Sequence, residues 1–386
     1  MATPPSAERT PWIRAARMRS LLLDDPQRDH PDVGTRTPLD VVEWFGAMQG
    51  QDLGSVQWSL GLRTGLTRAD IAVALESGEV LRTWPMRGTL HLVPGRDARW
   101  MLEHLGARAL AGAATRRAHL ELTEADADCG AEALGAALTG GTTLTRAECV
   151  AAIEAAGVSA AGQRAYHLLW YASQKGITCV GPNRGNEQTF VLLEEFAPDA
   201  VRLDREAALA TIAERFVRSH GPVTAHDLAR WADLTVRDAR AGLASADSVT
   251  VLTLDERELF VHDALREALA DPDEQAPIPP ARALPGFDEL VLGYRDRTAQ
   301  LDAAHERRVV PGGNGVFFPT LAVGGQVVGT WRRKELTRSI TLTATPFAPV
   351  PTRARTALGR ALTFYCDFMG KPGRISWADH GAEQPT

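Results

Sequence analysis

The sequence predicts an α+β protein, mainly α, with about three tandem winged helix-turn-helix units and a small β-rich C-terminal unit. A helix-start motif recurs along the chain, and each copy lies before a pair of short β-like runs. From Ile278 onward, proline-rich loops and glycine turns between strand-like runs replace the helical pattern. The expected units are residues 1–120, 121–200, 201–277 and 278–386.

The recurring motif is a threonine three positions before an acidic residue. Its copies are Thr67 with Asp70, Thr145 with Glu148, and Thr224 with Asp227. Side chains at this spacing cap the first turn of a helix reciprocally, so each copy predicts a helix start. The copies are not in strict phase, because a further helix follows the second and third copies but not the first. The repeat therefore predicts the units without fixing their boundaries.

Each copy is followed by a predicted two-stranded hairpin. The paired runs are Val80–Pro85 with Thr89–Val93, Ile177–Gly181 with Thr189–Leu193, and Val249–Leu254 with Glu258–His262. Helices followed by such a hairpin are typical of a winged helix-turn-helix, which usually sets one helix in the major groove of DNA and its wing on the backbone. Several units on one chain can line a concave DNA channel, some of them only as buttresses.

Hydrophobic periodicity and turn residues predict the remaining elements. Helices are expected at Trp12–Leu23, Leu39–Met48, Ser55–Arg63, Ala161–Gln174, Thr235–Leu243 and Arg353–Phe368. Residues 315–330 should form two strands joined by a tight turn at Gly324-Gly325, and Ser339–Thr345 a third strand. Trp84, Trp170 and Trp231 fall in apolar-periodic runs, which favours the core over exposed stacking platforms.

Composition narrows the class of protein. The 386 residues are 44% hydrophobic and 23% charged, which is ordinary for a globular protein, and the net charge is −6. That charge argues against an indiscriminate DNA coat, although a local basic channel is compatible with it. The four cysteines form no C-x-x-C, and no apolar run is long enough to span a membrane. We expect a cytoplasmic protein, monomeric by default because no dimerisation heptads are visible.

Known cofactor motifs are not found. The sequence has no H-E-x-x-H metal motif, no P-loop, no G-x-G-x-x-G after a strand and no G-x-S-x-G nucleophile elbow. Pro311–Gly315 is glycine-rich but lacks the Lys-Ser/Thr of a P-loop, so we expect a loop there. No metal and no cofactor are expected.

The Gln49-Gly50-Gln51 segment is the candidate centre of the chemistry. A glutamine amide donates and accepts hydrogen bonds and does not titrate, so it can position water but cannot deprotonate it. On a continuous helix, Gln49 and Gln51 would point to nearly opposite sides. If the helix from Leu39 ends or kinks at Gly50, the two amides can converge. Taken alone, the pair is more simply interpreted as two solvated residues at a helix end.

Several separated motifs resemble the AlkZ/AlkX group of bacterial DNA glycosylases, also described as a winged-helix DNA-binding family. They are Gln49–Gln51, Met86–Val93, Leu284–Glu289 with Gly293–Arg297, and Gly315–Phe317 through Gly329–Arg332. The resemblance covers roughly Arg14 to Phe368. It implies a monofunctional glycosylase that removes N7-alkylated purines, including interstrand crosslinks, from double-stranded DNA. It also implies that Gln49 and Gln51 are catalytic.

Other residues are weaker candidates for DNA contact. Arg87 is expected at a wing tip, and Gln163 and Arg164 at the start of a recognition-type helix, where a solvated first turn is an equal alternative. His91 lies in an apolar strand, where a histidine is usually satisfied and half-buried, and the resemblance raises it to a contact candidate. Asp288 and Arg295–Arg297 are better explained by internal salt bridges.

A second hypothesis rests on the same repeats but assigns the chain no catalytic activity. In it, the chain is a non-enzymatic winged-helix regulator or damage-binding protein, and the two glutamines are structural.

Overall fold

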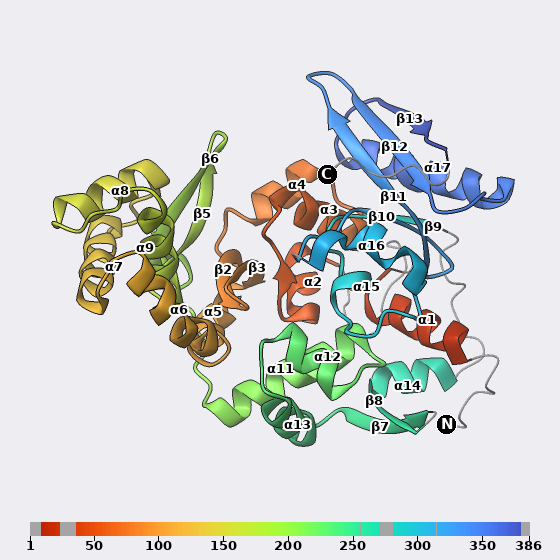
Figure 1. The fold of residues 1–386 in the computed structure, drawn as a ribbon, viewed down its shortest axis with the longest axis horizontal. Coiled ribbons are helices and arrows are strands. Elements are labelled where there is room, and N and C mark those ends of the chain that lie inside the picture. The colour runs from red at the N-terminus through yellow and green to blue at the C-terminus, as the bar shows by residue number, and fades with distance from the viewer. Residues whose placement is uncertain (1–8, 24–35, 255, 271–280, 314, 380–386) are drawn as a thin grey trace.

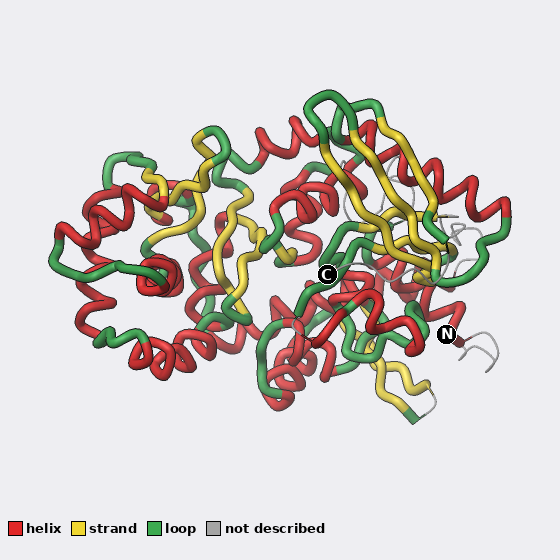
Figure 2. The backbone as a smooth tube through the Cα atoms, turned by 45° about the horizontal axis from the view of Figure 1, so that its top comes forward, coloured by secondary structure: helices red, strands yellow, loops and turns green. Residues whose placement is uncertain are grey.

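The computed structural model describes residues 9–23, 36–254, 256–270, 281–313 and 315–379. Across these residues the chain is an α+β protein in which helices hold more residues than strands (Figures 1 and 2). The predicted fold class is confirmed at this level.

The N-terminal half holds most of the helices. They are α1 (Arg9–Ser20), α2 (Pro38–Phe45), α3 (Leu53–Thr64), α4 (Arg68–Ala74), α5 (Ala98–His104), α6 (Ala107–His119), α7 (Glu124–Leu138), α8 (Arg146–Ala155), α9 (Gln163–Gln174) and α10 (Leu193–Phe196). The later helices are α11 (Arg205–His220), α12 (Ala225–Trp231), α13 (Val236–Ser245), α14 (Asp263–Ala270), α15 (Glu289–Leu292), α16 (Glu306–Val309) and α17 (Thr352–Phe368).

Within the described residues, the strands form three sheets. A six-stranded sheet has the order β1 (Met48–Gln49), β3 (Thr89–Pro94), β2 (Val80–Met86), β5 (Thr178–Arg184), β6 (Glu187–Leu192), β4 (Leu144–Thr145). A two-stranded sheet pairs β7 (Val249–Leu254) with β8 (Arg257–His262). The C-terminal sheet has the order β13 (Gly373–Trp377), β12 (Ile340–Pro346), β11 (Gln326–Glu335), β10 (Thr320–Val323), β9 (Ala281–Leu284).

One order of elements occurs three times. A helix, a very short strand, two helices and a hairpin follow one another as α2-β1-α3-α4-β2-β3 and as α7-β4-α8-α9-β5-β6. In the third copy, α11-α12-α13-β7-β8, the bridge between Val223 and Phe260 replaces the short strand. The three hairpins predicted from the sequence are therefore confirmed. The first two copies share the large sheet, because β2 pairs with β5 at Arg82 and Val180.

The structure also explains why the sequence motif is out of phase. All three predicted capping boxes form, but Thr67 caps α4, the third helix of its copy, whereas Thr145 and Thr224 cap second helices. The residue of the first copy that corresponds to Thr145 is Asp52, which caps α3. A capping box marks a helix start without saying which helix begins there, so the motif could not set the register of the repeat.

The C-terminal unit has more strands than the sequence predicted. β10, β11, β12 and α17 were expected, and β9 and β13 were not. The stretch after Ile278 was expected to be a loop, but β9 lies in it and pairs with β10 from Thr320 to Val323. β13 pairs in parallel with β12. Residues 271–280, which include most of the predicted proline-rich entry, lie outside the described residues.

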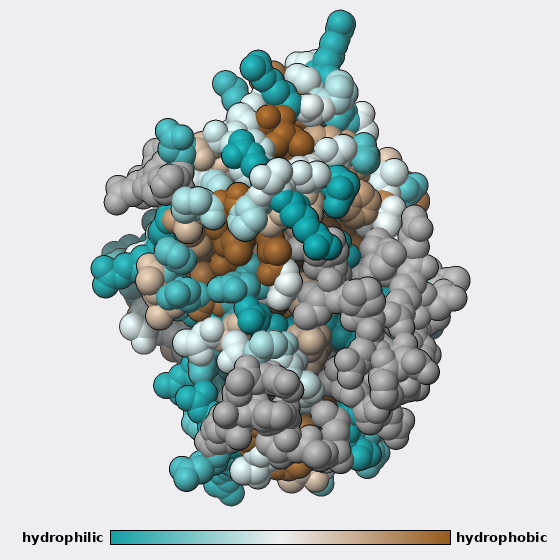
Figure 3. All heavy atoms as spheres, turned by 90° about the vertical axis from the view of Figure 1, so that its right-hand side faces the viewer, coloured by the Kyte–Doolittle hydropathy of each residue, from teal (hydrophilic) through white to brown (hydrophobic). Residues whose placement is uncertain are grey.

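The described residues form two large hydrophobic clusters, and a small third cluster joins α1, β8 and α14. The larger extends from α1–α3 through α11–α13 to the C-terminal sheet, and the smaller is built mainly from α7, α8 and α9. The smaller cluster belongs to the lobe at the left of Figure 1. The β5–β6 and β11–β12 hairpins project toward the same side of the molecule, with α4 between them (Figures 1 and 2). On the face at the right of Figure 1, apolar atoms show between polar ones (Figure 3).

Candidate active site

The two glutamines lie in the connection between β1 and α3. Gln49 is the last residue of β1 and pairs with His91 of β3, and Gln51 precedes Asp52, the N-cap of α3. In the other copies the cap residue directly follows the apolar strand residue, as in Leu144-Thr145. The Gln49-Gly50-Gln51 segment is thus an insertion in an otherwise repeated connection.

The predicted helix from Leu39 to Met48 is too long. α2 ends at Phe45, and Gly46 closes it with a φ of 78°, a conformation that favours glycine. Met48 lies at a helical spacing from the apolar residues before it, but in the structure it belongs to β1, where its side chain is buried. The prediction that Gly50 ends the helix is therefore wrong, because the chain has already turned four residues earlier.

Gly50 lies in close contact with the backbone of β3. A Cβ atom added to it would lie 3.2 Å from the His91 carbonyl carbon and 3.2 Å from the Leu92 nitrogen. Its N–H donates to the Leu90 carbonyl at 2.8 Å. The glycine therefore lets this segment lie flat against the backbone of β3.

Backbone donors fix the orientation of both amides. The Gln51 N–H donates to Gln49 Oε1 at 2.7 Å, and the Leu90 N–H donates to Gln51 Oε1 at 3.2 Å. Only a carbonyl oxygen can accept these bonds, so the oxygen and nitrogen of each amide are assigned without ambiguity. Neither Nε2 group has a hydrogen-bond partner within the described part of the chain. Gln49 is half-buried and Gln51 is exposed.

His91 of β3 and Arg87 of the β2–β3 turn contact each other. His91 is fully buried, with Nδ1 2.8 Å from the Thr89 carbonyl oxygen and Nε2 2.8 Å from Arg87 Nη2. Burial and the Arg87 charge lower the pKa of His91 well below its ordinary value. The ring is therefore neutral, with its proton on Nδ1 and Nε2 accepting from Arg87. A direct contact of His91 with DNA would require exposure of this side chain.

The expected wing tip at Arg87 is a tight turn, but the arginine does not extend from it. Arg87 and Gly88 have φ values of 56° and 65°. The Arg87 side chain folds back onto His91, and burial lowers the pKa of its guanidinium. A phosphate contact at this position remains a prediction.

Gln163 and Arg164 open α9 as predicted. Gln163 Oε1 accepts a hydrogen bond from Arg116 of α6, and Arg164 pairs with Glu121 at 2.9 Å. A cavity of about 580 Å³ brings Arg87 and Gln163 together, and it is lined by neither Gln49, Gln51 nor Arg164. Of the predicted site residues, Arg87 and Gln163 thus line one cavity, whereas Gln49 and Gln51 lie together before α3.

Three cations near the N-terminal half of α3 were not predicted. Arg333 of β11 approaches Asp52 at 4.0 Å. Arg82 lies in a 340 Å³ pocket between α3, α4 and the β5–β6 hairpin, together with Arg68. Burial lowers the pKa of Arg82 to about 10, and Asp52 partly opposes this shift. No local pattern marks these residues, because segments far apart in the sequence bring them to the first turn of α3.

A buried polar network anchors α3 and α15. Arg63 is fully buried and pairs with Asp288 at 3.0 Å, and Glu289 Oε2 accepts from Trp231 at 3.1 Å and lies 3.2 Å from His220 Nε2. Arg297 pairs with Glu306 at 2.8 Å. The predicted internal salt bridges are confirmed for Asp288 and Arg297, and Asp296 pairs with Arg257 at 2.8 Å, whereas Arg295 makes no ion pair within the described residues.

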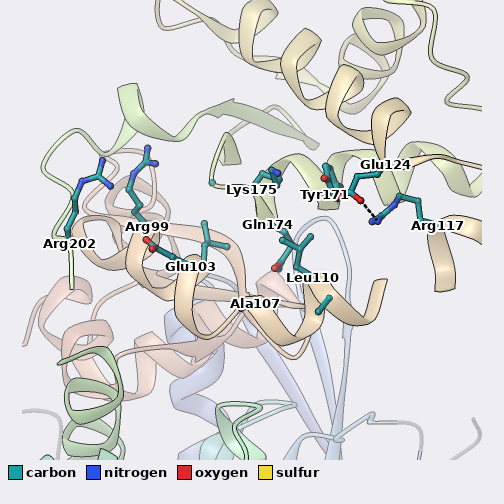
Figure 4. A pocket seen from close by; sticks show the side chains of 13 residues that line it. Arg99, Glu103, Ala107, Leu110, Arg117, Glu124, Tyr171, Gln174, Lys175 and Arg202 are labelled. Carbon is teal, nitrogen blue, oxygen red and sulfur yellow. Dashed lines mark ion pairs between the residues drawn. The ribbon is translucent and has the colours of Figure 1, made fainter. Parts of the chain in front are cut away.

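A third hollow is lined by both charged and apolar residues. It has a volume of about 560 Å³ and lies between α5, α6 and the end of α9 (Figure 4). Arg99 and Arg202 lie close together at one end, and at the other Arg117 pairs with Glu124 at 3.7 Å. None of the predicted site residues lines it.

Within the residues described, no group of His, Cys, Asp and Glu side chains is arranged to hold a metal ion. Over the same residues, no helix has the length and apolar character needed to cross a membrane.

The comparisons with known proteins identify the class. The family of AlkZ-like DNA glycosylases matches residues 42–368, so the chain belongs to this family and is a DNA glycosylase. An interstrand DNA cross-link repair glycosylase of Streptomyces sahachiroi is 28% identical over 313 residues, which are 76% of this chain and 81% of the relative. The solved structure of Streptomyces sahachiroi DNA glycosylase AlkZ matches with a TM-score of 0.76 at 25% identity, covering 95% of this chain and 98% of that one. The resemblance found in the sequence is confirmed.

Proposed function

We propose that this glycosylase is monofunctional and hydrolyses the N-glycosidic bond of N7-alkylated purines, including those in interstrand crosslinks. The observation that carries the proposal is the Gln49-Gly50-Gln51 insertion, which presents two amides that cannot titrate at the start of α3. The cross-link repair named for the Streptomyces sahachiroi relative supports the crosslink substrate.

Uncharged amides are sufficient because the substrate is already activated. An N7-alkylated purine carries a positive charge and leaves as a neutral base, so no general acid is required. A water oxygen bonds to C1′ as the C1′–N9 bond breaks, the bonding pair moves to N9, and the water proton passes to solvent. The transition state resembles an oxocarbenium ion, which needs only a weakly activated water.

Gln49 and Gln51 hold that water through their amide oxygens. Each oxygen already accepts one backbone hydrogen bond, and a carbonyl has two lone pairs, so each can still accept one water O–H. Accepted in this way, the water keeps its own lone pair free to attack C1′. The amide dipoles also favour the positive charge that develops on the sugar.

Asp52 is the alternative base. Its Oδ1 accepts from the Ser55 N–H at 3.1 Å and its Oδ2 from the Ser55 hydroxyl at 3.1 Å. Both oxygens are thus engaged in capping α3, which favours a structural role. The alternative to catalysis as a whole is a winged-helix regulator or damage-binding protein.

We further propose that the three repeated copies are winged helix-turn-helix units that line a concave channel for duplex DNA. Their order of elements supports this, as do the two hairpins that project on the same side as α4 (Figure 1). The units are those placed from the sequence, 1–120, 121–200 and 201–277, followed by 278–386. The enzyme works as a monomer on chromosomal DNA, in the cytoplasm and at the nucleoid.

Release of 7-methylguanine from methylated duplex DNA tests the function. Wild type should release it, and the Gln49→Ala/Gln51→Ala variant should bind the same duplex but release at least 100-fold less. Uracil, a neutral base, should not be released efficiently by either. Efficient uracil excision would refute the proposed mechanism. Sequence-specific binding without base release would favour the regulator.

A further inference from the structure

The pocket beside the first turns of α3 is lined by hydrogen-bond donors. It has a volume of about 340 Å³ and lies between α3, α4 and the β5–β6 hairpin. The polar side chains that line it are Gln57, Arg68, Glu76, Arg82, Asn183 and Asn186. Each of them except Glu76 carries N–H donors, so the pocket is suited to an anion.

Arg82 is a largely buried cation that lacks an anionic partner. Its Nε atom is buried without a hydrogen bond, and its guanidinium forms no ion pair within the described residues. Burial lowers the pKa of Arg82 to about 10, and the charge of Asp52 offsets part of this shift, so the side chain stays protonated at neutral pH. Desolvating a charge without pairing it is unfavourable, and an anion that enters the pocket would therefore be bound well.

Gln57 and Arg68 supply further donors to the same pocket. Gln57 is 5% exposed, and its Oε1 accepts a hydrogen bond from Arg68 Nε at 3.3 Å. This bond assigns the amide nitrogen of Gln57, which makes no hydrogen bond within the described part of the chain. Arg68 also approaches Glu335 at 3.7 Å, whereas Arg82 has no such carboxylate. A buried amide donor beside guanidinium groups matches the oxygens of a phosphate.

The pocket is continuous with the proposed catalytic segment. Leu53 lines the pocket and lies two residues after Gln51. Asp52, between them, caps α3 and acts on the charge of Arg82. The β5–β6 hairpin, which forms one wall, projects toward the same side of the molecule as the β11–β12 hairpin (Figure 1). A DNA strand that presents a base to Gln49 and Gln51 would therefore carry its backbone next to this pocket.

We propose that Arg82, together with Gln57 and Arg68, binds one phosphate of the strand that carries the damaged nucleotide and so positions that nucleotide against the glutamine pair. The inference rests on the proposed function, in which damaged duplex DNA is the substrate. In the complex, the Arg82 guanidinium gains the anion that it lacks in the free protein. Arg82 should therefore strengthen DNA binding while destabilising the free protein.

A double-mutant cycle between protein and DNA tests this assignment. The duplexes carry 7-methylguanine on a 2′-fluorinated sugar, because the fluorine disfavours an oxocarbenium-like transition state and so prevents base release during the measurement. In each duplex, one phosphate that flanks the lesion is replaced by an uncharged methylphosphonate. Dissociation constants are measured for wild type, Arg82→Gln and Arg82→Lys. Arg257→Gln is the matched control, because it removes the same charge from an exposed arginine of β8, on the side away from the β5–β6 hairpin (Figures 1 and 2).

At one flanking position, the methylphosphonate should weaken wild-type binding about 10-fold. Arg82→Gln should weaken binding of the unmodified duplex by a similar factor and be insensitive to the methylphosphonate at that position, while Arg82→Lys should keep part of the sensitivity. The slope of log affinity against log salt should become shallower by about 0.9 for Arg82→Gln and stay unchanged for Arg257→Gln. Without DNA, Arg82→Gln should melt no lower than wild type, because the arginine charge has no partner in the free protein.

Equal sensitivity of wild type and Arg82→Gln to the methylphosphonate at every position would overturn the inference, as would wild-type affinity in Arg82→Gln. A lower melting temperature of Arg82→Gln without any such coupling would assign Arg82 to the fold instead. Inorganic phosphate that stabilises wild type but not Arg82→Gln, again without coupling to a backbone position, would mark a site for a free anion and also overturn it. These results leave the proposed function standing. Failure of wild type to release 7-methylguanine from the unfluorinated duplex would overturn the proposed function alone, and wild type that binds no duplex would overturn both.

Discussion

Replacing Gly50 by alanine should lower the rate of base release strongly while reducing the free energy of unfolding only modestly. The new Cβ atom would sit 3.2 Å from two backbone atoms of β3, closer than nearly all real Cβ contacts, so the strands must part by a few tenths of an ångström. Overpacking of this kind costs about 1–3 kcal/mol, and the lost freedom of the unfolded chain returns about 0.4–1 kcal/mol. We expect a net loss of stability of about 0.5–2 kcal/mol.

The rate of 7-methylguanine release should fall even under conditions in which the variant is fully folded. The displaced segment carries both the Gly50 N–H bond to Leu90 and the Leu90 N–H bond to Gln51 Oε1. A misplacement of about 1 Å at a reacting group can cost about 100-fold in rate. A shift of a few tenths of an ångström should lower single-turnover release of 7-methylguanine about 10-fold, measured where urea unfolding shows the variant to be fully folded.

Gly359→Ala is the matched control for this experiment. Its Cβ meets nothing within 4 Å on α17, so the same substitution should stabilise the protein by about 0.5–1 kcal/mol without changing release. Gly50→Ala with wild-type stability and a rate within twofold of wild type would refute the close-approach reasoning. Equal losses in the two variants would show that the effect is not specific to β1.

Three further predictions concern the buried pairs and the amides. Arg63→Met should cost about 3–5 kcal/mol in urea unfolding, because it leaves Asp288 buried without its partner. The Arg63→Met/Asp288→Leu variant should recover part of that loss, and no recovery would argue against the pairing. The unfolded His91 titrates near pH 6.5 and the folded one well below it, so stability should fall as pH drops through about 6.5, by up to about 1.4 kcal/mol per pH unit. His91→Gln should weaken this dependence, and an unchanged slope would contradict it. Because amides do not titrate, saturated release of 7-methylguanine should be level from about pH 6 to 8.5, whereas a rise governed by one carboxylate would implicate Asp52.

Local signals made much of the fold predictable. Thr145 and Thr224 mark helix starts because a capping box is closed within four residues of the chain. The hairpins followed from short β-like runs separated by tight turns. The Gln49-Gly50-Gln51 segment stood out through its residue types and the family resemblance, and the comparisons confirmed the family.

The candidate site depended on contacts that leave little trace in the local sequence. β1 has two residues, and its strand character comes from pairing with β3, about forty positions later in the chain. Because of that pairing, α2 ends at Phe45 rather than near Gly50, and Gly50 lies close to the backbone of β3. The same packing buries His91 and brings the Arg87 side chain into contact with it.

The sequence by itself therefore determined the three helix starts with capping boxes, the hairpins and the family. Each depends on residue identity or on bonds between near neighbours. Tertiary structure alone decided the phase of the repeat, the β1–β3 register, the Arg63–Asp288 pair and the pocket beside Arg87. These features depend on which distant segments pack together, and hydrophobic burial selects that packing without regard to order along the chain.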